Sequence, residues 1–402
     1  MKDSGIQTRE RIFTKEYALV TCINFLFNVN FMSMMTTSSG YALERFGASN
    51  SQAGFAAGIF IIGAIAARLF AGWYTTETRY KSTLLFGVAG MAVVSAAYFF
   101  AASFPIFCLV RVVNGFMFGF GMNSAFTIIS SIIPKSRVGE GMGYFALSQT
   151  TALALGPLLA IRIMNIWGMT SVFLLAAMAG AIGTVLALFL NLPAVSKPAG
   201  EGMQNKGRLI NRIIEMKVLP IAALCFLFYC GHGSILTFIA VYGAQLGLQE
   251  YTAYIFVVIA IVTVASRPYV SRRFDRKGPN TIIYPGLALF ASALMVLSFS
   301  TYGWMFLVVG VMIGLGSGAV QSATLSLVVS MVSKDRLALA NSTYYTFIDS
   351  AMAVGPVIAG ALITAGSFHS MYFTMSIVVF FGLPLYYAVY ARNSRLNDIQ
   401  KS

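Results

Sequence analysis

Two charged side chains interrupt long apolar stretches of the sequence. Arg111 lies within residues 105–130, and Asp349 lies within residues 337–363. Because a charge at the centre of a bilayer costs about 2.5–3.5 kcal/mol on insertion scales, each of them needs an explanation. A carboxyl group taken out of water binds a proton more readily, and a nearby arginine opposes this. We therefore interpret Asp349 as a proton-carrying acid. We interpret Arg111 as the group that tunes its protonation or binds an anionic part of a substrate; a static ion pair between the two is the alternative.

Polar side chains at helical spacing mark further candidate contacts to a substrate. Asn24 and Asn28 share one helical face with Thr21 and Met35, at spacings of three, four and seven residues. Exposing two amides to lipid would be costly, so this face meets protein or a wet cavity. We predict hydrogen bonds to substrate, with hydrogen bonds that hold helices together as the alternative. Weaker candidates of the same kind are Asn114, Asn123, Gln149 and Gln321.

Aromatic residues lie close to these polar groups in the sequence. Tyr229 and His232 flank glycines, a pattern typical of a deformable segment. Tyr345 shares a helical face with Asp349 and Met352. Aromatic and methionine side chains at such a place could bind an amphipathic ligand or could simply pack. We include Tyr229 and Tyr345 among the candidate substrate contacts.

The elements that position these residues follow from composition. The chain has 402 residues, of which 58% are hydrophobic and only 10% are charged. A soluble protein of this length would have about 25% charged residues. The apolar residues come in runs of roughly 20, the length that crosses a bilayer, so we predict a multi-pass membrane protein without a separate soluble domain. The first run is too long for a cleaved signal peptide, and we expect it to be retained.

The sequence gives little support for a catalytic site or a metal site. The four cysteines lie inside apolar runs without CxxC spacing, and there are only two histidines, so we expect neither disulfides nor a metal site. The 13 acids lie mostly in loops, and no group of nucleophile, acid and base falls at one depth. The sequence also lacks a P-loop. We therefore predict neither an enzyme nor a nucleotide-driven pump.

Twelve membrane spans can be counted in the sequence. They cover about 17–40, 51–73, 82–101, 105–130, 139–163, 168–191, 217–243, 251–270, 281–299, 303–330, 337–363 and 369–391. All but three of the 27 Lys and Arg residues lie in the terminal segments or beside loops that follow even-numbered spans. This bias marks the cytoplasmic side, so we expect both termini there and the protein in the cytoplasmic (inner) membrane. Because the net charge of +14 is dispersed over short segments between spans, we expect no nucleic-acid partner.

The second half of the sequence repeats the first at an offset of 199 residues. The matching pairs are Arg68 and Arg267, Gly115 and Gly314, Gly119 and Gly318, Lys135 and Lys334, Arg137 and Arg336, Gly156 and Gly355, and Pro157 and Pro356. One gapless register over this length predicts two six-helix halves, residues 1–192 and 217–402, joined by a cytoplasmic linker at 193–216. Transport folds are commonly built from such repeats, with the substrate site near the midplane between them.

The loops after the second and eighth spans carry a motif. In the second half, Asp275, Arg276 and Gly278 match the D, R and G of the pattern G-x-L-x-D-R-x-G-R-R. Ser271 stands at its first glycine. In the first half Gly72 and Lys81 fit the pattern, while Thr76 replaces the aspartate. Through this motif the sequence resembles the major facilitator superfamily over essentially its whole length.

Motifs within the spans add to the resemblance. The fourth span begins an R-x-x-x-G pattern at residues 111–115. Helix-bend motifs are expected at Gly156 and Pro157 in the fifth span and at Gly355 and Pro356 in the eleventh. The first of these pairs looks like part of the exporter-associated pattern G-x-x-x-G-P-x-x-G-G, although Ala152 and Ala160 stand where glycines are expected.

The resemblance implies a fold and a gate. The fold is an all-α integral membrane protein of 12 transmembrane helices in two six-helix pseudo-symmetric bundles, whose fourth and eleventh spans line the cavity. Asp275 would latch the halves on the cytoplasmic side, near the start of the fifth span, where a helix dipole favours a carboxylate. The alternative is a basic loop that only fixes topology, with an incidental acid.

The resemblance also implies a function. We expect a secondary transporter that couples efflux of a small organic or amphiphilic solute to protons by alternating access. The alternative is proton-coupled uptake of a small, anionic solute, with Arg111 as its anchor. No cofactor is expected, since the proton motive force supplies the energy. The expected partners are the small-molecule substrate and the lipid bilayer, and we expect a monomer.

Overall fold

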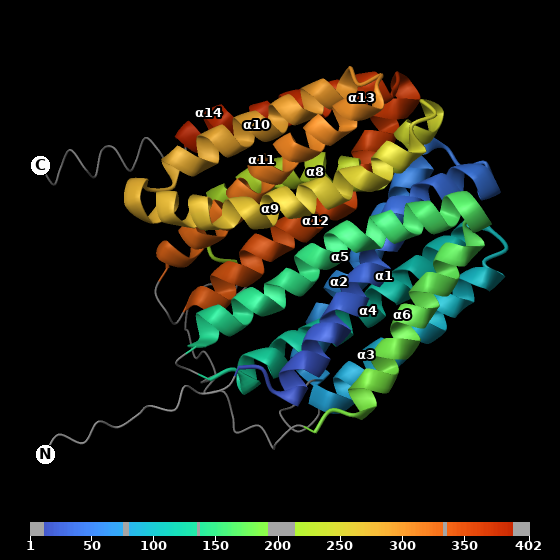
Figure 1. Ribbon diagram of the computed structural model, residues 1–402, viewed down its shortest axis with the longest axis vertical. Coiled ribbons are helices and arrows are strands. Elements are labelled where there is room, and N and C mark those ends of the chain that lie inside the picture. Colours follow the sequence, from blue (N-terminus) through green and yellow to red (C-terminus); the bar gives the residue numbers. More distant parts are fainter. Residues whose placement is uncertain (1–11, 75–79, 135–136, 192–213, 333–335, 389–402) are drawn as a thin grey trace, which may run out of the picture.

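The computed structural model describes residues 12–74, 80–134, 137–191, 214–332 and 336–388. Within these ranges, the side chains of residues 69–74, 138–140, 143, 271, 275 and 337–338 are not described. The first half contains α1 (Lys15–Phe46), α2 (Asn50–Tyr74), α3 (Tyr80–Ala97), the 3-10 turn η1 (Tyr98–Phe100), α4 (Phe104–Ile132), α5 (Val138–Trp167) and α6 (Thr170–Leu188). The second half contains α8 (Leu219–Gln245), α9 (Gln249–Lys277), α10 (Asn280–Ser298), α11 (Gly303–Ser330), α12 (Leu337–Ala365), α13 (Phe368–Phe380) and α14 (Gly382–Tyr386). Figure 1 shows this arrangement.

The helices begin and end at residues that suit helix ends. Thr14 caps α1 by accepting a hydrogen bond from the backbone N–H of Tyr17 at 3.1 Å. Proline stands in the first turn of α4 and of α8, where its missing N–H costs nothing. Gly47 ends α1 with φ 60° and Gly278 ends α9 with φ 77°, in the left-handed region that glycine adopts without strain. Gly278 is therefore needed where the loop motif places it.

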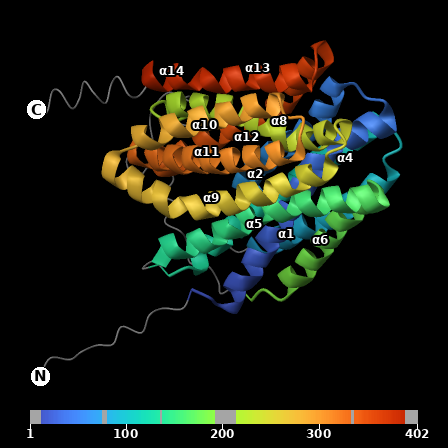
Figure 2. The ribbon, with the colours of Figure 1, turned by 45° about the horizontal axis from the view of Figure 1, so that its top comes forward.

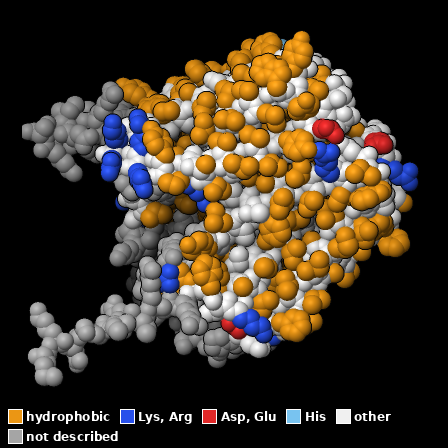
Figure 3. All heavy atoms as spheres, in the orientation of Figure 1, with side chains coloured by type: hydrophobic (Ala, Val, Ile, Leu, Met, Phe, Trp, Pro, Cys, Tyr) orange, Lys and Arg blue, Asp and Glu red, His pale blue; other side chains and the backbone are white. Residues whose placement is uncertain are grey.

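Twelve helical segments of the described chain are long and apolar enough to cross a membrane, as the sequence predicted. The twelfth runs from Phe368 to Tyr386 and consists of α13 and α14 together. Figure 2 shows these two helices as an outer layer over α10 and α8. Large hydrophobic side chains such as Phe100, 82% exposed, cover the outside of the bundle (Figure 3). This surface suits lipid rather than water.

The helices pack as two similar halves. In the first half α2 packs on α4 and α1 on α5; in the second half α9 packs on α11 and α8 on α12. A Cβ atom on Gly115 would lie 1.8 Å from the carbonyl oxygen of Phe60. At the equivalent place a Cβ atom on Gly314 would lie 2.9 Å from the carbonyl oxygen of Ile259. Both glycines therefore allow close backbone contact, and the 199-residue repeat holds in space.

The two halves meet along three helix pairs, α2 with α12, α5 with α9 and α1 with α8. We call the end of the bundle where α1 begins at Lys15 and α14 ends at Tyr386 the terminal end. In Figure 1 it lies at the left in the second half and at the bottom in the first half. The other end, where α1 ends at Phe46 and α2 begins at Asn50, is the opposite end.

Candidate functional site

Asp349 lies near the middle of α12 and forms an ion pair with Arg68 of α2. The guanidinium Nη1 of Arg68 donates to the carboxylate Oδ2 of Asp349. The two residues belong to different halves of the molecule, so the ion pair crosses the interface between them. The Asp349 side chain is 16% exposed, whereas that of Arg68 is 45% exposed. One partner is thus mostly withdrawn from water, and the other borders an open space.

Arg111 does not meet Asp349, and the static Arg111–Asp349 ion pair considered from the sequence is wrong for this structure. Its side chain is completely buried within the first half. Nε donates to the carbonyl oxygen of Ala56 at 2.9 Å and Nη2 to that of Ala57 at 2.7 Å, and the guanidinium lies over the ring of Phe60, 5.1 Å from its centroid. The reason is the close approach of α2 and α4, which brings α2 carbonyls within reach of the guanidinium.

A second arginine crosses the interface on the other side of the molecule. Nη2 of Arg267, on α9, lies 3.4 Å from Oγ1 of Thr150 on α5. Arg267 is the repeat equivalent of Arg68, and Thr150 stands 199 residues before Asp349. The pairs Arg68–Asp349 and Arg267–Thr150 are therefore equivalent bridges between the halves, one with a carboxylate and the other with a hydroxyl group.

The halves are joined tightly at the opposite end. A Cβ atom on Gly54 would lie 2.0 Å from the carbonyl oxygen of Pro356, and one on Gly58 would lie 2.2 Å from that of Ala353. The backbones of α2 and α12 are therefore in direct contact there.

Polar contacts also join the halves at the opposite end. Ser39 of α1 donates to the carbonyl oxygen of Thr237 of α8. Arg162 of α5 pairs with Glu250 of α9 at 3.3 Å and donates to the hydroxyl oxygen of Tyr254. All three helix pairs of the interface are thus closed at this end.

The helices part toward the terminal end. At 1.5 Å per residue, Arg68 lies about 15 Å from Gly58 along α2, toward the terminal end. Asp349 lies only about 6 Å from Ala353 along α12 in the same direction. The Arg68 side chain therefore has to reach back along the helix axes to meet Asp349. Figure 3 shows a recess in the surface between the left ends of α9 and α5. This recess is on the α5–α9 side of the interface, whereas the ion pair joins α2 and α12.

The amides of the first half mostly hold helices together. Asn24 Nδ2 donates to Ser148 Oγ of α5 at 2.6 Å, and Asn28 Nδ2 donates to the carbonyl oxygen of Asn24 at 2.8 Å. Asn114 Nδ2 donates to Ser95 Oγ of α3 at 3.2 Å. All three asparagines are buried. The contacts of Asn24 and Asn114 join different helices and fit the alternative of interhelical hydrogen bonds, whereas the contact of Asn28 lies within α1.

Asn30 belongs to the same polar core and was not predicted. Its Nδ2 donates to Ser95 Oγ at 2.9 Å and to the carbonyl oxygen of Ala176 of α6 at 3.1 Å. The signal was present, since an asparagine stands in the middle of an apolar run. Asn30 falls off the helical face that carries Asn24 and Asn28. Its partners come from α6, which packs against α1, and from Ser95 of α3.

The second half gathers several predicted residues around Asp349. Tyr229 of α8 is buried and lies within electrostatic reach of Gln321, Tyr345 and Asp349. Gln321 is exposed, and Tyr345 is 43% exposed one helical turn before Asp349. His232 packs among the rings of aromatic neighbours instead. An acid, an amide and two phenols thus lie together near the interface.

Gln149 and Asn123 belong to the first half, Gln149 on the interface helix α5 and Asn123 on α4. Gln149 is half-buried beside Thr150, and Asn123 is exposed on α4. Their side chains border open space rather than the buried polar core. They remain predictions as substrate contacts.

The loop motif is only partly described. Gly72 lies in the last turns of α2, and Asp275 and Arg276 lie in the last turn of α9. The side chain of Asp275 is outside the described residues, so the predicted latch stays a prediction. Arg276 and Lys277 are exposed, and Figure 3 shows basic side chains gathered at the left edge over the end of α9.

The two Gly-Pro pairs lie inside helices α5 and α12. A Cβ atom on Gly156 would lie 2.8 Å from Met32 Cβ of α1, and one on Gly355 would lie 2.8 Å from Cys230 Cα of α8. Both pairs therefore sit where two helices of one half approach closely. The predicted bend at Pro157 and Pro356 stays a prediction.

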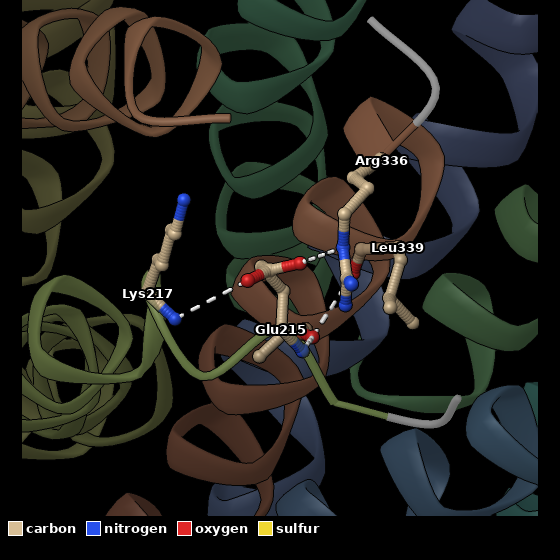
Figure 4. A network of polar contacts seen from close by, with 5 residues as sticks. Glu215, Lys217, Arg336 and Leu339 are labelled. Carbon is tan, nitrogen blue, oxygen red and sulfur yellow. Dashed lines mark hydrogen bonds and ion pairs between the residues drawn. The ribbon is translucent and has the colours of Figure 1, made fainter. Parts of the chain in front are cut away.

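A polar network at the terminal end was missed from the sequence. Glu215, 5% exposed, accepts a hydrogen bond from Arg336 Nε at 2.5 Å, and its backbone N–H donates to Thr343 Oγ1 at 2.9 Å (Figure 4). The backbone N–H of Lys217 lies 3.4 Å from the other carboxylate oxygen. The network fixes the segment before α8 to the start of α12, the helix that carries Asp349. Glu215 falls in the stretch interpreted as linker, where a buried acid was not expected.

Among the described residues, no group of three or more His, Cys, Asp and Glu side chains is placed to hold a metal ion. Away from the Arg162–Glu250 pair at the opposite end, the described groups at the interface are two arginines, one carboxylate, hydroxyls and amides. These groups can bind a polar solute and exchange a proton.

Comparisons with known proteins bear on this arrangement. The sequence matches the family described as Major Facilitator Superfamily over residues 18–301 and again over 275–401. "Multidrug resistance protein MdtG" of Citrobacter koseri is 25% identical over 341 residues, which cover 83% of this chain and 82% of that protein. The protein of the same name from Salmonella arizonae is 25% identical over 344 residues and covers 83% of each chain.

Solved structures show the same fold at low sequence identity. The nucleoside transporter NupG (D323A mutant) superimposes with a TM-score of 0.75 at 11% identity, over 93% of this chain and 99% of that chain. A bacterial homolog to the human lysosomal transporter Spinster, in an inward-facing and unoccupied conformation, gives a TM-score of 0.74 at 14% identity over 93% and 96% of the two chains.

Proposed function

Since this chain belongs to the major facilitator superfamily, a family of transporters rather than enzymes, we propose that it exports a small organic or amphiphilic solute in exchange for protons. The exchange proceeds by alternating access of a site between the two halves. The observation that carries the proposal is the ion pair between Arg68 and Asp349, which crosses the interface near the middle of the spans.

The ion pair offers a direct link between protonation and the positions of the halves. A carboxylate that binds a proton loses its charge, and Arg68 then loses its ionic partner. Arg68 and Asp349 belong to different halves, so the loss removes an attraction across the interface. The deprotonated form favours approach of the halves at this level, and the protonated form permits their separation. Asp349 is the one acid in the middle of a span among the described side chains.

The sidedness follows from charge. Basic residues crowd the segments at the terminal end, such as Arg272, Arg276 and Lys277 at the end of α9, and a basic bias marks the cytoplasmic side. The terminal end then faces the cytoplasm, and both termini lie there, in the inner membrane. The opposite end, where backbones touch, is the closed side. A solute enters this conformation from the cytoplasm, as an exporter requires.

Export is supported by the relatives, since the curated proteins it resembles are named for multidrug resistance. Uptake of a small anionic solute together with protons is the second candidate. It is favoured by the charge balance at the interface, where the arginines Arg68, Arg162 and Arg267 face the two acids Asp349 and Glu250 among the described side chains. In both cases the proton motive force is the energy source, no cofactor is required and a monomer suffices.

Everted membrane vesicles test the proposal. Respiration acidifies their lumen, and solutes are added at what was the cytoplasmic face. Solutes that alkalinise the lumen in vesicles with the wild-type chain, and not in empty vesicles, identify export by exchange. Asp349→Asn should abolish this response, whereas Glu250→Gln, which breaks the ion pair at the opposite end, should leave most of it. Proton exchange of normal size through Asp349→Asn would reject Asp349 as the coupling group.

A further inference from the structure

The repeat relates the two bridges between the halves residue by residue. Arg68 corresponds to Arg267, and Asp349 corresponds to Thr150, at the same offset of 199. In the first bridge a guanidinium of one half meets a carboxylate of the other. In the second, the equivalent guanidinium meets only a hydroxyl group. The first bridge therefore contains the negatively charged Asp349, and the second contains the neutral Thr150 at the equivalent position.

The contact between Arg267 and Thr150 is weak by itself. Its N···O distance of 3.4 Å is longer than the 2.7–3.2 Å usual for N–H···O hydrogen bonds. A guanidinium has five N–H donors in a planar fork that matches a carboxylate or phosphate. Arg267 is half-buried, so its charge is partly withdrawn from water. The buried hydroxyl group of Thr150 donates to the carbonyl oxygen of Ala146 at 3.3 Å, and it can exchange this long hydrogen bond for one to an anion.

Three other arginines, Arg68, Arg111 and Arg162, have stronger partners. Arg68 has the Asp349 carboxylate, and Arg162 has Glu250. Arg111 has two carbonyl oxygens at 2.9 and 2.7 Å and an aromatic ring. Among the described arginines that join the two halves, Arg68, Arg162 and Arg267, only Arg267 has neither a carboxylate nor a carbonyl partner. It is also at the interface, where a solute passes.

We propose that the transported solute carries an anionic group, a carboxylate, phosphonate or sulfonate, which binds between Arg267 and Thr150. The anion takes the place that the repeat gives to the Asp349 carboxylate on Arg68. This rests on the proposed function and names the substrate class of the same site. The bound solute then completes the second bridge between α9 and α5. Loading the site therefore draws the halves together at the level where the Arg68–Asp349 pair already joins them.

Binding to the purified full-length chain tests the site. The probes are 2-naphthoate and 2-naphthalenesulfonate, each beside its neutral amide, so that the two members of each pair share the apolar ring and differ in charge. The two anions should bind the wild-type chain at least tenfold more tightly than the amides, since a hydrogen bond to a charged group is lost in the amides. Equal binding of anions and amides would overturn the proposal.

Variants distinguish binding at this site from nonspecific binding of the naphthyl anions to the protein. Arg267→Gln should weaken binding of the anions about tenfold or more, and Thr150→Asp should do the same by supplying a built-in carboxylate. Thr150→Ser keeps the hydroxyl group and should keep the binding. Arg162→Gln removes an arginine from the opposite end and serves as the matched control. If Arg267→Gln binds the anions as the wild type does, the site is elsewhere and the proposal fails.

Transport in everted vesicles distinguishes this proposal from the proposed function. Suppose that only neutral or cationic solutes alkalinise the lumen and that Arg267→Gln leaves this response unchanged. The proposed export function is then supported, and the proposed anion site is rejected. If the naphthyl anions alkalinise the lumen through the wild type and not through Arg267→Gln, the anion site stands. If no anionic, neutral or cationic solute is exchanged for protons, both proposals are rejected.

Discussion

Replacing Asp349 by asparagine should change how far the two halves separate at the terminal end. The substitution keeps the size of the side chain and removes the charge that holds Arg68. Hydrogen bonds to charged groups contribute about 1.5–3 kcal/mol, and exposed ion pairs about 0.2–1 kcal/mol. Because Asp349 is mostly buried and Arg68 is 45% exposed, we expect about 1–2 kcal/mol. This corresponds to a shift of about 5- to 30-fold between conformations with and without the bridge.

Spin labels on the two halves measure this shift. Ser130 near the end of α4 and Ser330 at the end of α11 are exposed and lie at the terminal end, one on each half. The four natural cysteines are replaced first. In Asp349→Asn the distribution of distances between the labels should move toward longer values. Lowering the pH should do the same in the wild type, because the ion pair exists above the pKa of the carboxyl group and is lost below it.

The outcome has a control and a refutation. Asp349→Asn should no longer respond to pH in this range. Glu250→Gln breaks the ion pair with Arg162 at the opposite end, whose partners are 37% and 71% exposed, and should change the distribution little. If Asp349→Asn and the wild type gave the same distances at every pH, the ion pair would not bear on the positions of the halves.

Three further predictions concern the scaffold. Gly115→Val should prevent normal folding, since its Cβ would lie 1.8 Å from the Phe60 carbonyl oxygen. The yield of monodisperse protein checks this prediction. A normal yield would show that α2 and α4 are not in contact there. Arg111→Lys should lower the free energy of unfolding by about 1–3 kcal/mol, because an ammonium group cannot keep the planar contact with two carbonyls and a ring; unchanged denaturation in detergent would argue against that contact. Glu215→Gln should cost about 1–3 kcal/mol and speed proteolytic cleavage before α8, whereas equal cleavage rates would mean that the network with Arg336 does not hold that segment.

The fold was open to prediction because its signals are periodic and repeated. Apolar runs of bilayer length give the spans, and the 199-residue register gives the two halves. Gly115 and Gly314 are equivalent positions of that repeat, and the structure places both against equivalent carbonyls. Such features depend on one helix and its neighbour, which a sequence pattern can reveal.

The partners of the charges were harder to predict. The depth of Asp349 in an apolar run marks it as a candidate site residue. The sequence suggests Arg111 as its partner, because both residues lie inside spans. Arg68 was counted with the cytoplasmic segments, although it stands four residues before the loop motif and repeats as Arg267. Which arginine reaches the acid depends on how far α2 and α12 part, and spacing along one helix does not contain that distance.

The central claim is that Asp349 gives up a proton when the solute binds. Proton release can be measured directly by adding 2-naphthalenesulfonate to the purified chain in weak buffer with a pH-sensitive dye. We predict proton release from the wild type at a pH where the carboxyl group is partly protonated. We predict none from Asp349→Asn, although that variant still binds the anion through Arg267. Equal proton release from both proteins would contradict the account.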